Sequence, residues 1–130
     1  MPYDNFSSNK HMTALTQTKA EFLTDCLVEE INNRWYVDAL ESGTKLQFPK
    51  AFVFPGRKYL AVKVCDVLNK TEKYDGRDGG RIFMFVDRQT GEVFKPANLK
   101  APAKGVRYLI HHLAENPHIC DQYGSFLYLR

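Results

Sequence analysis

The chain has 130 residues and a mass of 15.0 kDa, which is enough for one domain with its own hydrophobic core. Its composition, 44% hydrophobic and 25% charged with a net charge of +3, excludes a collagen, a coiled coil, a wholly disordered chain and a disulfide scaffold. The charge is uneven: residues 57–107 carry twelve basic and six acidic groups, net +6, while the flanking segments are slightly acidic. This basic middle is either a solvated surface of mixed charge or a side that faces an anionic partner.

The cysteine pattern and the N-terminus favour an intracellular protein. Cys26, Cys65 and Cys120 are far apart and form no C-x-x-C pair, which indicates free thiols in a reducing compartment. We expect Cys26 and Cys65 to be buried as small hydrophobic side chains. The sequence has no apolar run of membrane-spanning length and no signal-peptide core, so no membrane partner is expected. We expect a flexible arm over residues 1–12 and a single domain over residues 13–130.

The first predicted element is a helix over residues 16–34. Its apolar residues recur at helical spacing along one face. Thr18, with Glu21 three positions later, matches a capping box at its start. The shorter and more broken pattern over 36–55 predicts one or two short strands, with a turn at Ser42-Gly43.

Three strands are predicted in the middle of the chain. Residues 59–68 alternate, residues 82–86 are apolar on both sides, and residues 92–95 form the returning strand. The segment 87–91 predicts a hairpin turn, because its aspartate can accept bonds from the following amides and its glycine suits a left-handed backbone. The loop 69–81 has no aliphatic residue, and we expect it to be the most mobile internal segment.

A second helix is predicted over residues 102–115, with Pro102 in its first turn and Asn116-Pro117 at its end. The tail 123–130 is either a strand or a last packing segment. This α-β-β-β-α order predicts an α+β fold, in which a three- or four-stranded antiparallel sheet has two helices packed on one face. We expect eight apolar residues to share its core: Leu23, Leu27, Ile31, Val62, Val64, Phe85, Val106 and Leu113.

The most informative cluster consists of four cations, Lys95, Lys100, Lys104 and Arg107. If the second helix begins near residue 102, Lys104, Arg107 and His111 lie along one edge of it, and Lys100 lies just ahead of its start. Exposed cations at a helix N-terminus are repelled by about 0.3–1 kcal/mol each. Their presence there suggests a bound anion such as a phosphate backbone. The alternative is that these long side chains only solvate the helix.

Metal and enzyme signals are weak. His111, His112, His118 and Cys120 are ligand types for zinc, but their spacing matches no standard site. Cys120 beside Asp121 could be a nucleophile, although a structural thiol is the favoured interpretation. The chain has no nucleophile elbow, P-loop or H-E-x-x-H motif. We therefore expect no metal, no cofactor and no enzymatic activity.

Aromatic residues on the predicted strands allow two interpretations. Tyr59, Phe83, Phe85 and Phe94 lie on the three-strand meander. They could stack nucleic-acid bases if one face of the sheet were open. We favour a role in the core, because the two helices must cover something.

Two resemblances concern the region of the cation cluster. The run V-D-x-x-T-G-E-V, then K-P-A and K-A-P-A-K-G-V-R, over residues 86–107 resembles small uncharacterised proteins of tailed phages and marine viruses. The resemblance implies a bacteriophage protein that is located in the host cytoplasm. It implies no particular activity, because those proteins are uncharacterised. The element order is similar to that of double-stranded RNA-binding domains, where basic residues at the second helix contact phosphates. Lys100 and Lys104 would match those positions, but the longer region 35–57, Pro102 and the tail depart from that family.

The sequence thus predicts a small non-enzymatic protein that binds DNA or RNA through Lys95, Lys100, Lys104 and Arg107. The sequence leaves the oligomeric state open, and a homo-oligomer is one alternative. The alternative function is a virion-associated or host-factor module for protein–protein interaction.

Overall fold

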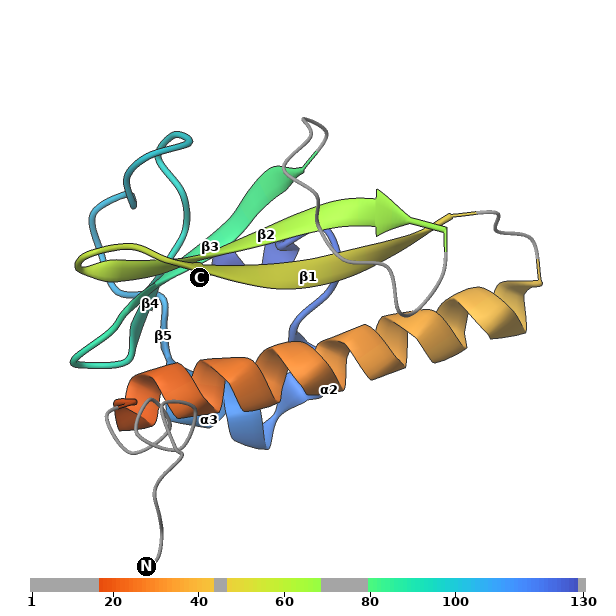
Figure 1. The fold of residues 1–130 in the computed structure, drawn as a ribbon, viewed down its shortest axis with the longest axis horizontal. Coiled ribbons are helices and arrows are strands. Elements are labelled where there is room, and N and C mark those ends of the chain that lie inside the picture. Colours follow the sequence, from red (N-terminus) through yellow and green to blue (C-terminus); the bar gives the residue numbers. More distant parts are fainter. Residues whose placement is uncertain (1–16, 44–46, 69–79, 129–130) are drawn as a thin grey trace, which may run out of the picture.

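The structure is a computed structural model, and it describes residues 17–43, 47–68 and 80–128. The predicted arm and nearly all of the predicted mobile loop lie outside these described residues. The elements follow one another as shown in Figure 1: α2 (Lys19–Ser42), β1 (Phe48–Pro55), β2 (Tyr59–Val67), β3 (Arg81–Asp87), β4 (Glu92–Phe94), β5 (Tyr108–Leu109), α3 (Ile110–Glu115), and the 3₁₀ turns η1 (Pro117–Ile119) and η2 (Ser125–Tyr128).

The five strands form one antiparallel sheet in the order β1-β2-β3-β4-β5, so each strand pairs with the next along the chain. The helices α2 and α3 lie on the same side of this sheet (Figure 1). The predicted α+β class is confirmed, with five strands in place of the three or four expected. The additional strand is β5, which lies within the segment predicted as the second helix.

Helix α2 begins where the sequence predicts and ends later. The Thr18 hydroxyl accepts a hydrogen bond from the Glu21 amide (3.0 Å), and the Glu21 carboxylate accepts one from the Thr18 amide (2.9 Å), which confirms the capping box. The helix continues to Ser42 instead of ending at residue 34, because the buried Trp35 prolongs its apolar face and no helix breaker precedes Gly43. Gly43 caps the helix with a left-handed backbone, φ 69°. The predicted turn is therefore this cap.

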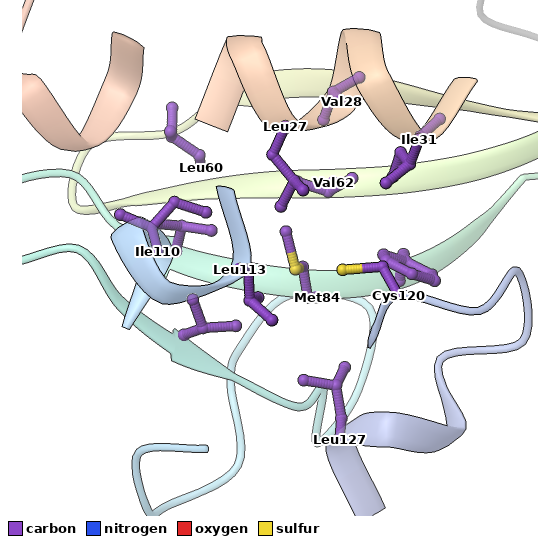
Figure 2. Packing of buried hydrophobic residues seen from close by; sticks show 14 of the residues in the cluster. Leu27, Val28, Ile31, Leu60, Val62, Met84, Ile110, Leu113, Cys120 and Leu127 are labelled. Atoms are coloured by element: carbon purple, nitrogen blue, oxygen red, sulfur yellow. The ribbon is translucent and has the colours of Figure 1, made fainter. Parts of the chain in front are cut away.

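The hydrophobic core lies between the two helices and the sheet. In Figure 2, Leu27 and Ile31 of α2 point toward Val62 of β2, and Leu113 of α3 lies close by. The core also takes Phe126 and Leu127 from the tail, which is a packing segment and not a strand. Among the eight predicted core residues, five are fully buried in this cluster and one packs at its margin: Leu27, Ile31, Val62, Val64 and Leu113, with Leu23.

Two predicted core residues lie elsewhere. Val106 is 47% exposed, because the segment that contains it is not helical. Phe85 is buried but is outside this cluster, whereas its neighbours Met84 and Val86 belong to it. Since side chains alternate along a strand, Phe85 points the opposite way from Met84 and Val86, to the face of the sheet away from the helices. A register shift between Val62 and Lys63 interrupts this alternation at Phe83, which stays in the core.

The edge strand β1 is held to α2 by a polar side chain. The Asn32 side chain accepts a hydrogen bond from the Ala51 amide (2.7 Å) and donates one to its carbonyl (2.9 Å). This satisfies backbone groups that an edge strand leaves unpaired. The prediction that Cys26 is buried is wrong, because Cys26 lies on the exposed face of α2. None of the described helices is long and apolar enough to cross a membrane.

Candidate nucleic-acid interface

The turn between β3 and β4 is fixed by its own polar groups, as the sequence predicts. The Asp87 carboxylate accepts hydrogen bonds from the amides of Gln89 (2.8 Å) and Thr90 (3.0 Å), and Gly91 adopts φ 78°. Burial alone would raise the pKa of Asp87. The amide bonds from Thr90 and Gln89, together with the charge of Lys58, outweigh this and lower it. The turn is therefore rigid and holds its aspartate ionised.

Arg88 of this turn serves the fold. Its guanidinium forms an ion pair with Glu21 and donates to the Gly56 carbonyl, and the Thr18 hydroxyl donates to the Arg88 carbonyl (2.7 Å). The pKa of Glu21 is lowered, first by the hydrogen bond from the Thr18 amide and also by Arg88. These bonds join the turn to the start of α2 and to the β1–β2 connection.

The prediction of a helix over 102–115 is wrong for most of its length, because α3 begins only at Ile110. The chain before it pairs with β4: the Ile110 amide donates to the Gly91 carbonyl (2.8 Å), and the Arg107 amide donates to the Val93 carbonyl (2.7 Å). The apolar residues of this segment have helical spacing, but the segment pairs with β4 instead of forming a helix. The four cations therefore do not line a helix edge.

Residues 95–107, which we call the basic loop, extend the hairpin of β4 and β5 beyond the sheet. Pro96 and Pro102 face each other as an isolated bridge, and the Ala103 amide donates to the Lys95 carbonyl (2.8 Å). Both prolines suit an extended backbone and donate no amide hydrogen bond. In Figure 1 this segment rises on the side of the sheet away from α2.

The two arms of the basic loop differ in length. Between the β4–β5 pairing and the proline bridge, the outgoing arm has two residues, 94–95, and the returning arm has five, 103–107. The longer arm must bulge, and Gly105 makes this possible with φ 98°. Lys104 lies on this bulge with an exposed side chain.

The tip of the basic loop is closed by Asn98. Its side-chain oxygen accepts hydrogen bonds from the amides of Lys100 (2.8 Å) and Ala101 (3.0 Å), as in an Asx turn. The Ala97 amide donates to the Ala101 carbonyl (3.0 Å). With its backbone fixed in this way, the tip presents Lys100 and Leu99, which is 75% exposed.

The structure thus brings the four predicted cations together on one loop. Lys100 and Lys104 are exposed, and neither forms an ion pair with a residue that the structure describes. Lys95 is half-buried, and its ammonium group lies 4.8 Å from the centre of the Tyr128 ring. Arg107 is half-buried, and its Nε is buried without a hydrogen-bond partner. Two cations are therefore free for an external partner, and two lie at the base of the loop.

The sheet face away from the helices carries a second group of residues beside the basic loop. The Tyr59 ring packs edge-on against Phe94 (5.8 Å between ring centres) and Phe85 (6.2 Å). Phe85 is buried, whereas Tyr59 and Phe94 are half-buried. Phe83, by contrast, packs in the core against Trp35. The expectation that all four aromatics belong to the core is therefore confirmed for Phe83 and wrong for Tyr59, Phe85 and Phe94.

Lysines lie over aromatic rings on this same face. The Lys58 ammonium group is 5.4 Å from the centre of the Tyr59 ring, and that of Lys63 is 5.0 Å from the centre of the Phe54 ring. We call Lys58, Tyr59, Lys63, Phe85 and Phe94 the aromatic face. The alternation of Tyr59 and Lys63 with the buried Leu60, Val62 and Val64 was the sequence signal for it.

Neither a metal site nor a reactive thiol emerges from the histidine–cysteine cluster. Among the described residues, no three His, Cys, Asp or Glu side chains converge as metal ligands. His112 instead stacks on Tyr108, with 6.1 Å between ring centres. Burial, and then the charge of Asp121, raise the pKa of Cys120 to about 12. Its thiol is therefore protonated at neutral pH and is not an activated nucleophile.

A groove lies on the other side of the molecule, between α2 and the segment around η1. It has a volume of about 650 Å³ and includes Trp35, Val37, His118 and the exposed Tyr123 among its lining residues. Its charged residues are mostly acidic: Glu30, Asp38 and Asp121, with Arg34. This groove does not suit an anionic ligand.

A model of one protein family matches residues 3–129, which is nearly the whole chain. The chain belongs to DUF7717, a family of unknown function. Comparisons with curated proteins and with solved structures found no match. In this DUF7717 protein the basic loop and the aromatic face are continuous, because Phe94 contacts Tyr59 and directly precedes Lys95.

Proposed function

We propose that the protein is a non-enzymatic nucleic-acid-binding protein whose basic loop contacts the phosphate backbone. The observation that carries this proposal is that Lys100 and Lys104 are exposed on a loop with a fixed backbone and have no ion-pair partner among the described residues. Lys95 and Arg107 add positive charge at the base of the loop. Phosphate contacts of this kind supply most of the affinity of non-specific nucleic-acid binding.

The rigidity of the loop supports a binding role. Asn98 closes the tip, and the bridge between Pro96 and Pro102 holds the two arms together. A loop that is already ordered loses little backbone freedom when it binds a ligand. The loop itself contains no acidic residue, so nothing within it offsets the positive charge.

The biological setting belongs to the same proposal. The resemblance of residues 86–107 to small proteins of tailed phages supports a bacteriophage protein that acts in the host cytoplasm. Phage and host nucleic acids are both present there.

Fluorescence anisotropy with labelled single- and double-stranded DNA and RNA, between about 50 and 200 mM salt, tests the proposal. We expect binding that weakens steeply with salt. The double variant Lys100→Ala/Lys104→Ala should bind less tightly. The slope of log affinity against log salt should fall by about 0.7 per lost contact for single strands or about 0.9 for duplexes.

The matched control is Lys19→Ala/Arg34→Ala, which removes the same number of cations from exposed positions of α2. It lies on the other side of the sheet from the basic loop (Figure 1) and should retain the slope of the unmodified protein. Equal losses in the two double variants would mean that only net charge matters. Absence of binding at low salt would contradict the proposal.

The second candidate function is protein–protein interaction, and the groove beside Trp35 is the observation that favours it. Val37 and Tyr123 expose apolar surface at this groove, where a partner protein or a second copy could pack. Tyr123→Ser should then weaken the partner contact and leave nucleic-acid binding unchanged. A concentration-dependent mass in analytical ultracentrifugation would detect self-association.

A further inference from the structure

The aromatic face has the form of a platform for unpaired bases. Tyr59 of β2 and Phe94 of β4 are half-buried and contact each other edge-on across β3, the strand that carries the buried Phe85. The described helices all lie on the opposite face (Figure 1). Apolar rings that remain partly exposed beside a cationic loop are the usual components of a surface that binds single strands.

We propose that the aromatic face binds single-stranded nucleic acid, with bases stacked on Tyr59 and Phe94 while the basic loop holds phosphates. This inference rests on the proposed function and specifies its substrate class. Bases in a duplex are already stacked on their neighbours, so their faces are not available to a protein ring. Only a strand with unpaired bases can use this platform, in contrast to the double-stranded RNA suggested by the element order.

The arrangement of charge on the face fits a polyanion. Lys58 and Lys63 come from β2 and its preceding turn, on the same face as Tyr59. Lys63 forms no ion pair with a described residue. The carboxylate of Asp87 is buried and accepts the amides of its own turn, although it also interacts with Lys58. Glu92 shares this face with Phe94, two positions away along β4, and accepts a hydrogen bond from the Thr90 hydroxyl, so the cations of the face and of the basic loop outnumber it.

Lys58 now lies over the ring on which a base would stack. Its ammonium group is 5.4 Å from the Tyr59 ring centre, on a long exposed side chain. A contact of this kind at an exposed site is weaker than stacking of a base on an aromatic ring. A base can therefore replace the ammonium group, which then remains within reach of the adjoining phosphate.

The test compares three probes of equal length: oligo-dT, an abasic strand with the same phosphates, and a duplex. We expect the unmodified protein to bind oligo-dT more tightly than either of the others. Tyr59→Leu and Phe94→Leu keep apolar volume on the sheet but remove the stacking ring. Each should weaken oligo-dT binding by about 5- to 100-fold, without changing the salt slope or the affinity for the abasic strand.

Tyr123→Leu is the matched control, because it removes an exposed aromatic ring from the other side of the molecule and should bind as the unmodified protein does. A second measurement, which needs no variant, is photo-crosslinking of the unmodified protein to 5-iodouracil DNA, with crosslinks expected on Tyr59 or Phe94. Equal affinity for oligo-dT and the abasic strand, or crosslinks only elsewhere, would overturn this inference but leave phosphate binding in place. Failure to bind all three probes would overturn both proposals.

Discussion

Two connections at opposite ends of β4 use similar residues for different purposes. The β3–β4 turn and the tip of the basic loop are each closed by an Asx side chain, Asp87 in the first and Asn98 in the second. In the turn, the neighbouring cation Arg88 is bonded to Glu21 and to the Gly56 carbonyl. In the basic loop, the neighbouring cation Lys100 extends into solvent.

This difference separates structural cations from those available for binding. A cation that forms ion pairs or hydrogen bonds with buried or half-buried groups is needed by the fold. Its positive charge is therefore no evidence for a bound ligand. A cation on a fixed backbone without an internal partner contributes little to folding. The contrast predicts that substitutions in the turn change stability, whereas substitutions in the basic loop change binding.

The largest expected effect comes from the glycines of the two connections. A Cβ at Gly91 would lie 2.9 Å from the Ile110 side chain, in addition to the strain of its positive φ, whereas a Cβ at Gly105 would meet nothing within 4 Å. We expect Gly91→Ala to lower the free energy of unfolding by about 2–4 kcal/mol and Gly105→Ala by about 1–2 kcal/mol. Urea denaturation followed by Trp35 fluorescence measures both. Equal losses in the free energy of unfolding would show that the fold depends equally on the two connections.

The next largest effects on stability should come from removing the two Asx side chains that close these connections. Asp87→Ala leaves two amides of a buried turn without their acceptor, at a cost of about 1–3 kcal/mol. Asn98→Ala does the same at an exposed tip, where water can replace the lost bonds, and should cost about 0.5–1 kcal/mol. The same denaturation experiment checks the order, and a larger loss for Asn98→Ala would reverse our view of which connection the fold needs.

Acid should weaken the turn and spare the basic loop. The folded-state pKa values of Asp87 and Glu21 are lowered from ordinary values of 3.8 and 4.5, so both contribute stability that is present above about pH 4.5 and lost as the pH falls through the lowered values. We expect the free energy of unfolding to decline below about pH 4.5. Asp87→Asn and Glu21→Gln should each make this decline shallower. An unchanged pH dependence in both variants would contradict the roles assigned to them.

Local sequence signals predicted the parts of the fold that depend on local chemistry. The capping box of α2, the turn at Asp87 and the strands of the meander each need only neighbouring residues, and all three are present. The second helix failed because its apolar spacing competed with pairing to β4, a contact that becomes visible only once Val93 and Tyr108 are adjacent in space. Phe85 was placed on the wrong side for a related reason, since a strand that is apolar on both faces does not reveal which face the helices cover.

The candidate interface was predicted in part. Residue type and clustering drew attention to Lys100 and Lys104, and both lie exposed on one loop. Their helical setting was wrong, because the bridge between Pro96 and Pro102 closes a hairpin in place of a helix start. The sequence favours the core for the rings of the aromatic face, because it predicts two helices on one side of the sheet but does not show which residues of the strands face them.

The smallest expected effect on stability is the one on which the functional contrast depends. Arg88→Ala removes a half-buried ion pair and leaves Glu21 without its partner, so we expect a loss of about 1–2 kcal/mol in the free energy of unfolding. Lys100→Ala/Lys104→Ala removes two exposed charges that have no ion-pair partner among the described residues, and should change stability by less than about 0.5 kcal/mol. Thermal and urea unfolding of the two variants, beside their anisotropy titrations, gives the comparison directly. If the double lysine variant unfolds as readily as Arg88→Ala, the basic loop is a structural corner, and its loss of binding could not be assigned to phosphate contacts.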